Sequence, residues 1–136
     1  MADNKLFKVK IISPTRVFYD GEVNSLELNT TEGEAGIYAN HIPMTLLLAP
    51  GILTLHEESG MKNAAVHSGF IEILGDHVTI LAESAEWPDE IDIHRAEEAK
   101  VRAERRLHGE GANQDMARAE MALKRSLVRL GLKKGN

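Results

Sequence analysis

Arginine is the residue type whose spacing in this chain points most directly to chemistry. Arg95 and Arg102 lie seven residues apart, and Arg125 and Arg129 lie four residues apart. On a helix, spacings of seven and four keep side chains on one face. Guanidinium groups bind phosphate oxygens in bidentate fashion, so two such faces brought together would hold a polyphosphate.

These arginines could instead form ion pairs with acidic residues on the same helix. Glu98 lies four residues before Arg102, and such a pair stabilises a helix by about 0.2 to 0.5 kcal/mol. Arg125 and Arg129 have no acidic residue three or four positions before them. These two are therefore predicted to take an external anion, either a nucleotide triphosphate or an acidic patch on a partner protein.

The other reactive side chains form no recognised site. The chain has no cysteine, and its six histidines are not spaced as zinc ligands. No serine lies in a nucleophile elbow, and no Walker phosphate-binding loop is present. The sequence predicts a non-catalytic protein that requires no metal or cofactor. A small hydrolase that pairs Glu83 or Glu86 with Asp92 stays open as an alternative.

The elements that must position the arginines change type at Trp87-Pro88. Short β-branched runs precede this point, and a region rich in Ala, Arg, Glu, Lys and Leu follows it. Residues 1–87 carry 12 acids and 5 Lys or Arg, whereas residues 88–136 carry 9 acids and 11 Lys or Arg. We predict two domains, a mainly β sandwich over 1–87 and an antiparallel α-helical hairpin over 88–136, with Trp87-Pro88 as the hinge.

Alternating apolar residues predict the strands of the first domain. Phe7, Val9 and Ile11 follow period two, and Asp20-Gly21 is predicted to turn the chain after them. Gly75-Asp76 separates two further apolar runs and predicts a tight hairpin. Many short strands at such spacing indicate a sandwich or barrel.

Capping residues predict two helices after Pro88. Asp89 or Asp92 can cap the first, Asp115 or Asn113 the second, and Gly131 is a natural C-cap. A glycine-rich loop over 109–113 joins them. Apolar stripes are predicted on the first helix at Ile93, Ala96, Ala99, Ala103 and Leu107, and on the second at Met116, Ala119, Leu123, Leu127 and Leu130. Because alanine buries little surface, docked and undocked states of the hairpin are expected to be close in free energy.

Composition narrows the function further. The net charge of -5 and an aromatic content of 4% disfavour nucleic-acid binding. No segment approaches the roughly 20 apolar residues of a spanning helix, and the first residues do not resemble a signal peptide. We therefore expect a soluble protein that reaches a membrane only through partners.

Residues 32–51, EGEAGIYANHIPMTLLLAPG, resemble the signature stretch of the epsilon subunit of F-type ATP synthases. Similar features are the opening KVKIISP at 8–14, GFIE at 69–72 and HVTILA at 77–82, so the resemblance covers almost the whole chain. It implies a rotor subunit that joins the gamma subunit to the c-ring. The residues implied at or near the c-ring contact are Glu32, Gly33, Glu34 and His41. Glycines at 33 and 36 would permit a positive φ there.

The IDIHRA segment at 91–96 is similar to a nucleotide-binding motif of some bacterial epsilon subunits. The resemblance implies that ATP is a regulatory ligand. Its motif residues would be Ile91, Asp92, Arg95 and Ala96, joined by Arg102, Arg125 and Arg129 through their helix positions. ATP would favour a compact hairpin, and an extended hairpin would enter the alpha and beta subunits and inhibit hydrolysis.

The same resemblance places the protein at the cytoplasmic face of the bacterial plasma membrane, where it would be bound peripherally. A β-sandwich ligand-binding module with a helical dimerisation tail is the alternative function.

Overall fold

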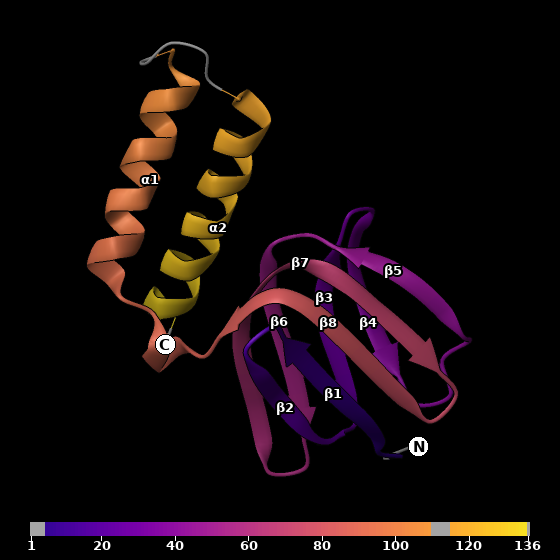
Figure 1. Cartoon of the computed structure of the whole chain (residues 1–136). Helices are drawn as coiled ribbons and strands as arrows, with labels where there is room; N and C mark the ends of the chain where they lie inside the picture. The colour runs from indigo at the N-terminus through magenta and orange to yellow at the C-terminus, as the bar shows by residue number, and fades with distance from the viewer. Residues whose placement is uncertain (1–4, 110–114, 136) are drawn as a thin grey trace.

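The computed structural model describes residues 5–109 and 115–135. A two-layered β domain is followed by two antiparallel helices that rise from one of its edges (Figure 1). This arrangement confirms the predicted mainly β sandwich and C-terminal helical hairpin. Among the described residues, no helix is long and apolar enough to cross a bilayer.

The β domain is one curled sheet of eight strands. They are β1 Phe7–Ser13, β2 Arg16–Val23, β3 Ser25–Thr30, β4 Gly33–Tyr38, β5 Met44–Leu48, β6 Gly51–Glu57, β7 Gly60–Leu74 and β8 His77–Glu86. Their order is β2-β1-β8-β7-β5-β3-β4, and β6 pairs with β3 and β7. The β1 and β8 strands are parallel, and the other pairs are antiparallel.

The long strand β7 makes the corner between the two layers. Its first half pairs with β6 and its second half with β5. The change falls at Ser68 and Gly69, which have φ values of 57° and 130°. Opposite them, Ala49 and Pro50 interrupt the partner strand between β5 and β6. Proline lacks a backbone donor, so this interruption costs no ladder hydrogen bond at Pro50.

The core between the layers is aliphatic. Val9, Ile11, Leu26, Leu55 and Ile80 are completely buried, in agreement with the predicted period-two pattern. The predicted hairpin at Gly75-Asp76 is confirmed, because Leu74 pairs with His77 across it.

The predicted turn at Asp20-Gly21 is wrong, because both residues lie inside β2. Asp20 pairs with Lys10 and Gly21 with Val9 on β1, and the chain turns earlier, at Pro14 and Thr15. A Cβ on Gly21 would lie 2.6 Å from the hydroxyl of Tyr19. The glycine therefore makes room for the tyrosine ring and has no role in a turn.

A short 3-10 helix, η1 Pro88–Glu90, leads from β8 to α1 Ile93–Leu107 and α2 Met116–Lys134. Asp92 caps α1 by accepting from the amides of His94 and Arg95, and Asp115 caps α2 through the amide of Arg118. These caps confirm two of the predicted alternatives. Apart from Gly109, the predicted loop at 109–113 lies outside the described residues.

Three details of the predicted hairpin are wrong. Gly131 does not end α2, which continues to Lys134 with Gly135 as its C-cap. Met116 and Leu127 are 46% and 47% exposed and lie outside the buried stripe, whereas Ser126 is buried. The Ser126 hydroxyl donates to the carbonyl oxygen of Ala122, 3.0 Å away, so its burial leaves no donor unpaired.

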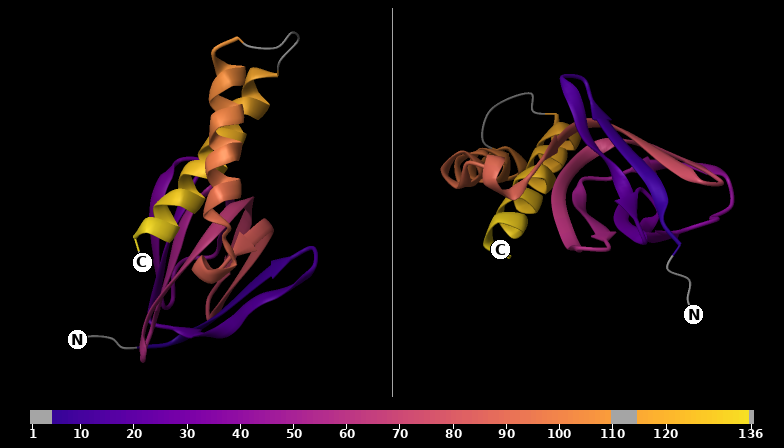
Figure 2. Two further views of the ribbon diagram at one scale, coloured as in Figure 1. Left: turned by 90° about the vertical axis from the view of Figure 1, so that its left-hand side faces the viewer. Right: turned by 90° about the horizontal axis from the view of Figure 1, so that it is seen from below.

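The hairpin touches the β domain mainly through the C-terminal half of α2, and α2 lies between α1 and the sheet (Figure 2). Leu132 and the half-buried Val128 pack against Ala65 of β7 and Ile91 of the linker. This cluster is small beside the sandwich core. The docked position of the hairpin therefore rests on few apolar contacts and on the polar contacts described next.

Candidate functional site

A cavity of about 310 Å³ lies where β8, η1, α1 and α2 meet. Its lining residues are Glu86, Glu90, Asp92, Arg95, Ala96, Ala99, Arg102 and Arg129. Five of them, Asp92, Arg95, Ala96, Arg102 and Arg129, belong to the set predicted for ATP. Glu86, Glu90 and Ala99 were not predicted, and no spacing in the sequence distinguishes Glu86 from the nearby Glu83.

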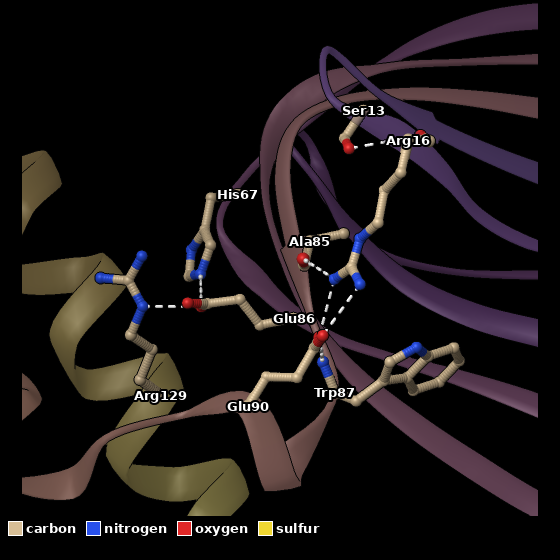
Figure 3. Close-up of polar contacts among 8 residues, drawn as sticks. All are labelled: Ser13, Arg16, His67, Ala85, Glu86, Trp87, Glu90 and Arg129. Carbon is tan, nitrogen blue, oxygen red and sulfur yellow. Dashed lines mark hydrogen bonds and ion pairs between the residues drawn. The ribbon is translucent and has the colours of Figure 1, made fainter.

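Glu86 connects the β domain to α2 (Figure 3). Its Oε1 accepts from Arg129 Nε at 2.7 Å and lies 3.2 Å from Nε2 of His67, which is 1% exposed. Burial acts to raise the pKa of Glu86, but the hydrogen bonds from His67 and Arg129 outweigh it and hold that pKa below its ordinary value. Glu86 therefore stays ionised and fixes one guanidinium at the cavity wall.

This pKa shift predicts a pH dependence of hairpin docking. Because the folded-state pKa of Glu86 lies below its ordinary value of 4.5, its contribution is present above 4.5 and is lost as pH falls through the lowered value. We expect Glu86→Gln to lower the free energy of unfolding at neutral pH by about 1 kcal/mol, since partial exposure weakens a charge-assisted hydrogen bond.

Thermal unfolding measured from neutral to acidic pH would check this expectation. The difference between the parent and Glu86→Gln should vanish in acid, whereas the exposed Glu83→Gln control should match the parent throughout. A difference that persists below the folded-state pKa would contradict the assignment.

The first two residues of the predicted nucleotide motif have structural tasks. Asp92 uses its carboxylate to cap α1, with Oδ1 3.0 Å from the amide of His94 and 3.2 Å from that of Arg95. Ile91 is 4% exposed and packs with Ala65 of the β domain and Leu132 of α2. Neither Asp92 nor Glu86 is free to act as half of a catalytic acid pair, which removes support for the hydrolase alternative.

Arg125 does not line this cavity. It lies in a wider groove of about 670 Å³ between α2 and the kink of β7, together with Arg106, Arg118 and Glu83. Arg125 and Arg129 lie four residues apart on α2, but their side chains line separate hollows. Sequence periodicity carries no information about that division.

The residues predicted for the c-ring contact follow one edge of the sheet. Glu32 lies in the exposed turn before β4, Gly33 and Glu34 begin β4, and His41 follows its far end. Thr30 holds the turn by donating to the carbonyl oxygen of Gly33, 2.7 Å away. Gly33 has the predicted positive φ, at 121°, whereas Gly36 is an ordinary strand residue. The segment is thus an edge strand with a turn at each end.

Sequence reasoning missed an apolar row on the outer face of the sheet. Cross-strand pairing places Val17, Ile12, Leu81, Phe70 and Leu47 side by side across β2, β1, β8, β7 and β5. Four of them are exposed, by 54% at Val17, 38% at Leu81, 39% at Phe70 and 62% at Leu47. We call these five residues the apolar row.

Polar side chains flank the apolar row. The neighbouring row on the same face consists of Lys10, Thr79, Glu72 and Thr45. A contiguous apolar strip with a polar rim is typical of a protein interface. Adjacent apolar pairs such as Phe70-Ile71 and Ile80-Leu81 were the available sequence signal, because one member of each pair must face away from the core.

A metal site finds no support in the described part of the chain, which has no group of three or more His, Cys, Asp or Glu residues that could hold an ion. The six histidines are dispersed in the sequence, and Nε2 of His67 already contacts Glu86.

Two family models together match nearly the whole chain. The model of the ATP synthase delta/epsilon chain β-sandwich domain matches residues 6–88, and that of its long α-helix domain matches residues 89–134. An ATP synthase epsilon chain from Caldanaerobacter subterraneus is 44% identical over 128 residues, which is 93% of each chain. One from Shouchella clausii is 44% identical over 127 residues, covering 93% of this chain and 94% of the relative.

Solved structures share the fold. A chain of the Euglena gracilis mitochondrial ATP synthase superposes with a TM-score of 0.79 at 23% identity, covering 90% of this chain and 78% of the other. A chain of the central stalk and c-ring structure of the Tetrahymena thermophila mitochondrial ATP synthase superposes with a TM-score of 0.60 at 16% identity over 98% of both chains.

Proposed function

The chain belongs to the family of ATP synthase epsilon chains, and from that premise we propose that it joins the gamma subunit to the c-ring and regulates ATP hydrolysis through its hairpin. The observation that carries the regulatory part is the cavity in which three arginines from both helices meet the β domain. A chain from the central stalk and c-ring structure of the Tetrahymena enzyme has the same fold.

The apolar row is the proposed contact with gamma. Its exposed side chains cross five strands of one face, and their burial by a partner would release apolar surface from water. A firm contact there suits a subunit that must turn together with gamma.

The β4 edge is the proposed contact with the c-ring. Glu32 in the turn and Gly33 and Glu34 at the start of β4 form an exposed acidic segment, and His41 lies beyond the other end of the strand. Polar groups of this kind suit the polar loops of a ring of membrane subunits. Contact with the membrane would then pass through the complex, at the cytoplasmic face of a bacterial plasma membrane.

The cavity is the proposed ATP site. Arg95 and Arg102 come from α1, Arg129 comes from α2, and their guanidinium groups suit phosphate oxygens. A volume of about 310 Å³ lies near the lower limit of small-molecule sites. Because the ligand would touch both helices and β8, its binding would favour the docked hairpin over any undocked form.

The undocked hairpin is the proposed inhibitor. Once released, α2 would present Arg125, Arg118 and Lys124 to acidic surfaces of the alpha and beta subunits and so obstruct rotation. No chemical step belongs to this chain in that scheme, and ATP acts on it as a regulator.

Calorimetric titration with ATP tests the proposed site. Arg102 forms no hydrogen bond or ion pair with any described residue, so Arg102→Ala removes a ligand contact without loosening the fold. We expect Arg102→Ala to weaken binding about tenfold, or about 1.4 kcal/mol. Arg118→Ala, which removes a guanidinium from the other groove, is the matched control and should bind as the parent does.

In the same titration, Arg125→Ala distinguishes the ATP site predicted from sequence, which includes Arg125, from the cavity in the structure, which does not. Its side chain lies outside the cavity, so the docked geometry predicts an affinity close to that of the parent. Absence of heat from the parent up to millimolar ATP, or equal losses in Arg102→Ala and Arg118→Ala, would refute the proposed site.

A further inference from the structure

The linker between the β domain and α1 is held by the β domain itself. We propose that residues 85–90 stay attached to the β domain when the hairpin moves, and that the pivot lies at Ile91-Asp92 and not at Trp87-Pro88. This inference rests on the proposed movement of the hairpin but does not depend on nucleotide binding.

A bidentate ion pair joins the linker to β2 (Figure 3). Arg16 donates from Nη1 to Glu90 Oε2 at 2.8 Å and from Nη2 to Glu90 Oε1 at 2.7 Å. Glu90 Oε1 also accepts from the amide of Trp87 at 2.9 Å. These hydrogen bonds hold the pKa of Glu90 below its ordinary value, with Arg16 as the main cause. The carboxylate therefore closes η1 and ties it to a strand 74 residues earlier in the chain.

Aromatic stacking supplies a second attachment. The Trp87 ring stacks on the Phe18 ring of β2 with 4.2 Å between the ring centroids. The guanidinium carbon of Arg16 lies over the Phe18 ring, 5.0 Å from its centroid. Trp87 also packs against the sandwich core. Residues on both sides of the bond between Trp87 and Pro88 are thus held by β2, which leaves this bond no freedom to act as a hinge.

The attachment ends at Ile91. Its amide donates to the carbonyl oxygen of Pro88 at 3.3 Å, and the next backbone bond inside a helix is that of Ala96 to Asp92. Between them, Ile91 and Asp92 are extended, with φ and ψ of -90° and 125° and of -89° and 109°. Two extended residues between helical turns can change φ and ψ without breaking a helix, as hinge residues do.

The contacts that hinder the movement lie on the other side of this pivot. Arg129 must leave Glu86, Lys133 must leave the carbonyl oxygen of Pro88, 2.9 Å away, and Leu132 must leave the cluster around Ala65. None of these steps requires the Arg16–Glu90 pair to open. Glu86 and Glu90 would remain on the β domain while Asp92 and Arg95 moved away, so opening would split the cavity into two halves.

Limited digestion with a protease that cleaves before aspartate tests the pivot. The bonds before Asp89 and before Asp92 both precede exposed aspartates, but the first lies inside the attached segment and the second lies at the proposed pivot. For the full-length chain, we expect mass spectrometry to find cleavage before Asp92 and none before Asp89. Arg16→Ala should bring on cleavage before Asp89, and Lys10→Ala, which removes a neighbouring exposed cation from β1, should not.

The outcomes separate the pivot from the proposed function. Cleavage that begins before Asp89 in the parent would overturn the position of the pivot while leaving a moving hairpin intact. Cleavage at neither bond would overturn the pivot together with the movement on which it rests.

The single tryptophan gives a second readout. With an acceptor dye on Lys124→Cys, energy transfer from Trp87 reports the hairpin, while the Trp87 emission maximum reports the linker. Combining Arg129→Ala with Leu132→Ala should reduce the transfer and leave the emission maximum unchanged. A red shift that accompanies the loss of transfer would mean that the linker moves with the hairpin, contrary to the proposal.

Discussion

Replacing Gly69 with alanine is expected to destabilise the β domain by more than about 3 kcal/mol. Gly69 has a φ of 130° at the corner of β7, and a Cβ there would lie 2.0 Å from the carbonyl oxygen of Leu81. That oxygen belongs to the backbone of β8, so it cannot turn aside as a side chain could. The substitution must therefore push β7 and β8 apart.

Gly60→Ala is the matched control for this prediction. Gly60 also has a positive φ, at 142°, but the space around its missing side chain is open. Its free energy of unfolding should fall only by the cost of the backbone strain, about 1 to 3 kcal/mol. Urea unfolding of the two variants distinguishes backbone strain from a steric clash. Equal decreases in the free energy of unfolding would contradict a backbone clash at Gly69.

Placing a charge at the centre of the apolar row is expected to weaken binding of gamma by at least about 30-fold, or about 2 kcal/mol. Phe70→Glu is the variant, because Phe70 has Leu47 on one side and Leu81 on the other. A partner that covers the row would have to desolvate the new carboxylate. Affinity for a complex of alpha, beta and gamma that lacks this chain provides the measurement.

Met61→Glu makes the comparison specific. Met61 is 60% exposed on the first half of β7, so it matches Phe70 in chemistry but lies outside the apolar row. It should bind gamma as the parent does, and both variants should keep the parent's circular dichroism. Undiminished affinity of a folded Phe70→Glu would remove the apolar row from the gamma contact.

Local signals in the sequence were sufficient to predict which segments form strands and which form helices. Alternation predicted β1, Gly75-Asp76 predicted the hairpin between β7 and β8, and Asp92 and Asp115 were among the predicted caps. Each signal acts over a few neighbouring residues, through backbone dihedral preferences or a side chain that reaches the nearest amides.

The errors arose where a local signal had a distant cause. Gly21 looked like a turn residue, but its missing side chain accommodates the Tyr19 ring inside β2. Gly131 looked like a helix end, although α2 continues past it because Leu132 still has a buried surface to reach. A glycine is permitted in both settings, and only the packing around it distinguishes them.

By itself, the sequence determined a β domain, a helical hairpin, their order and a set of arginines with helical spacing. The tertiary structure alone decided that Arg95, Arg102 and Arg129 share a cavity while Arg125 does not, and that five outward side chains form the apolar row. It also decided that Arg16 holds Glu90. The physical reason is distance along the chain, because register and docking follow from the simultaneous burial of residues tens of positions apart, and no short window of sequence contains that constraint.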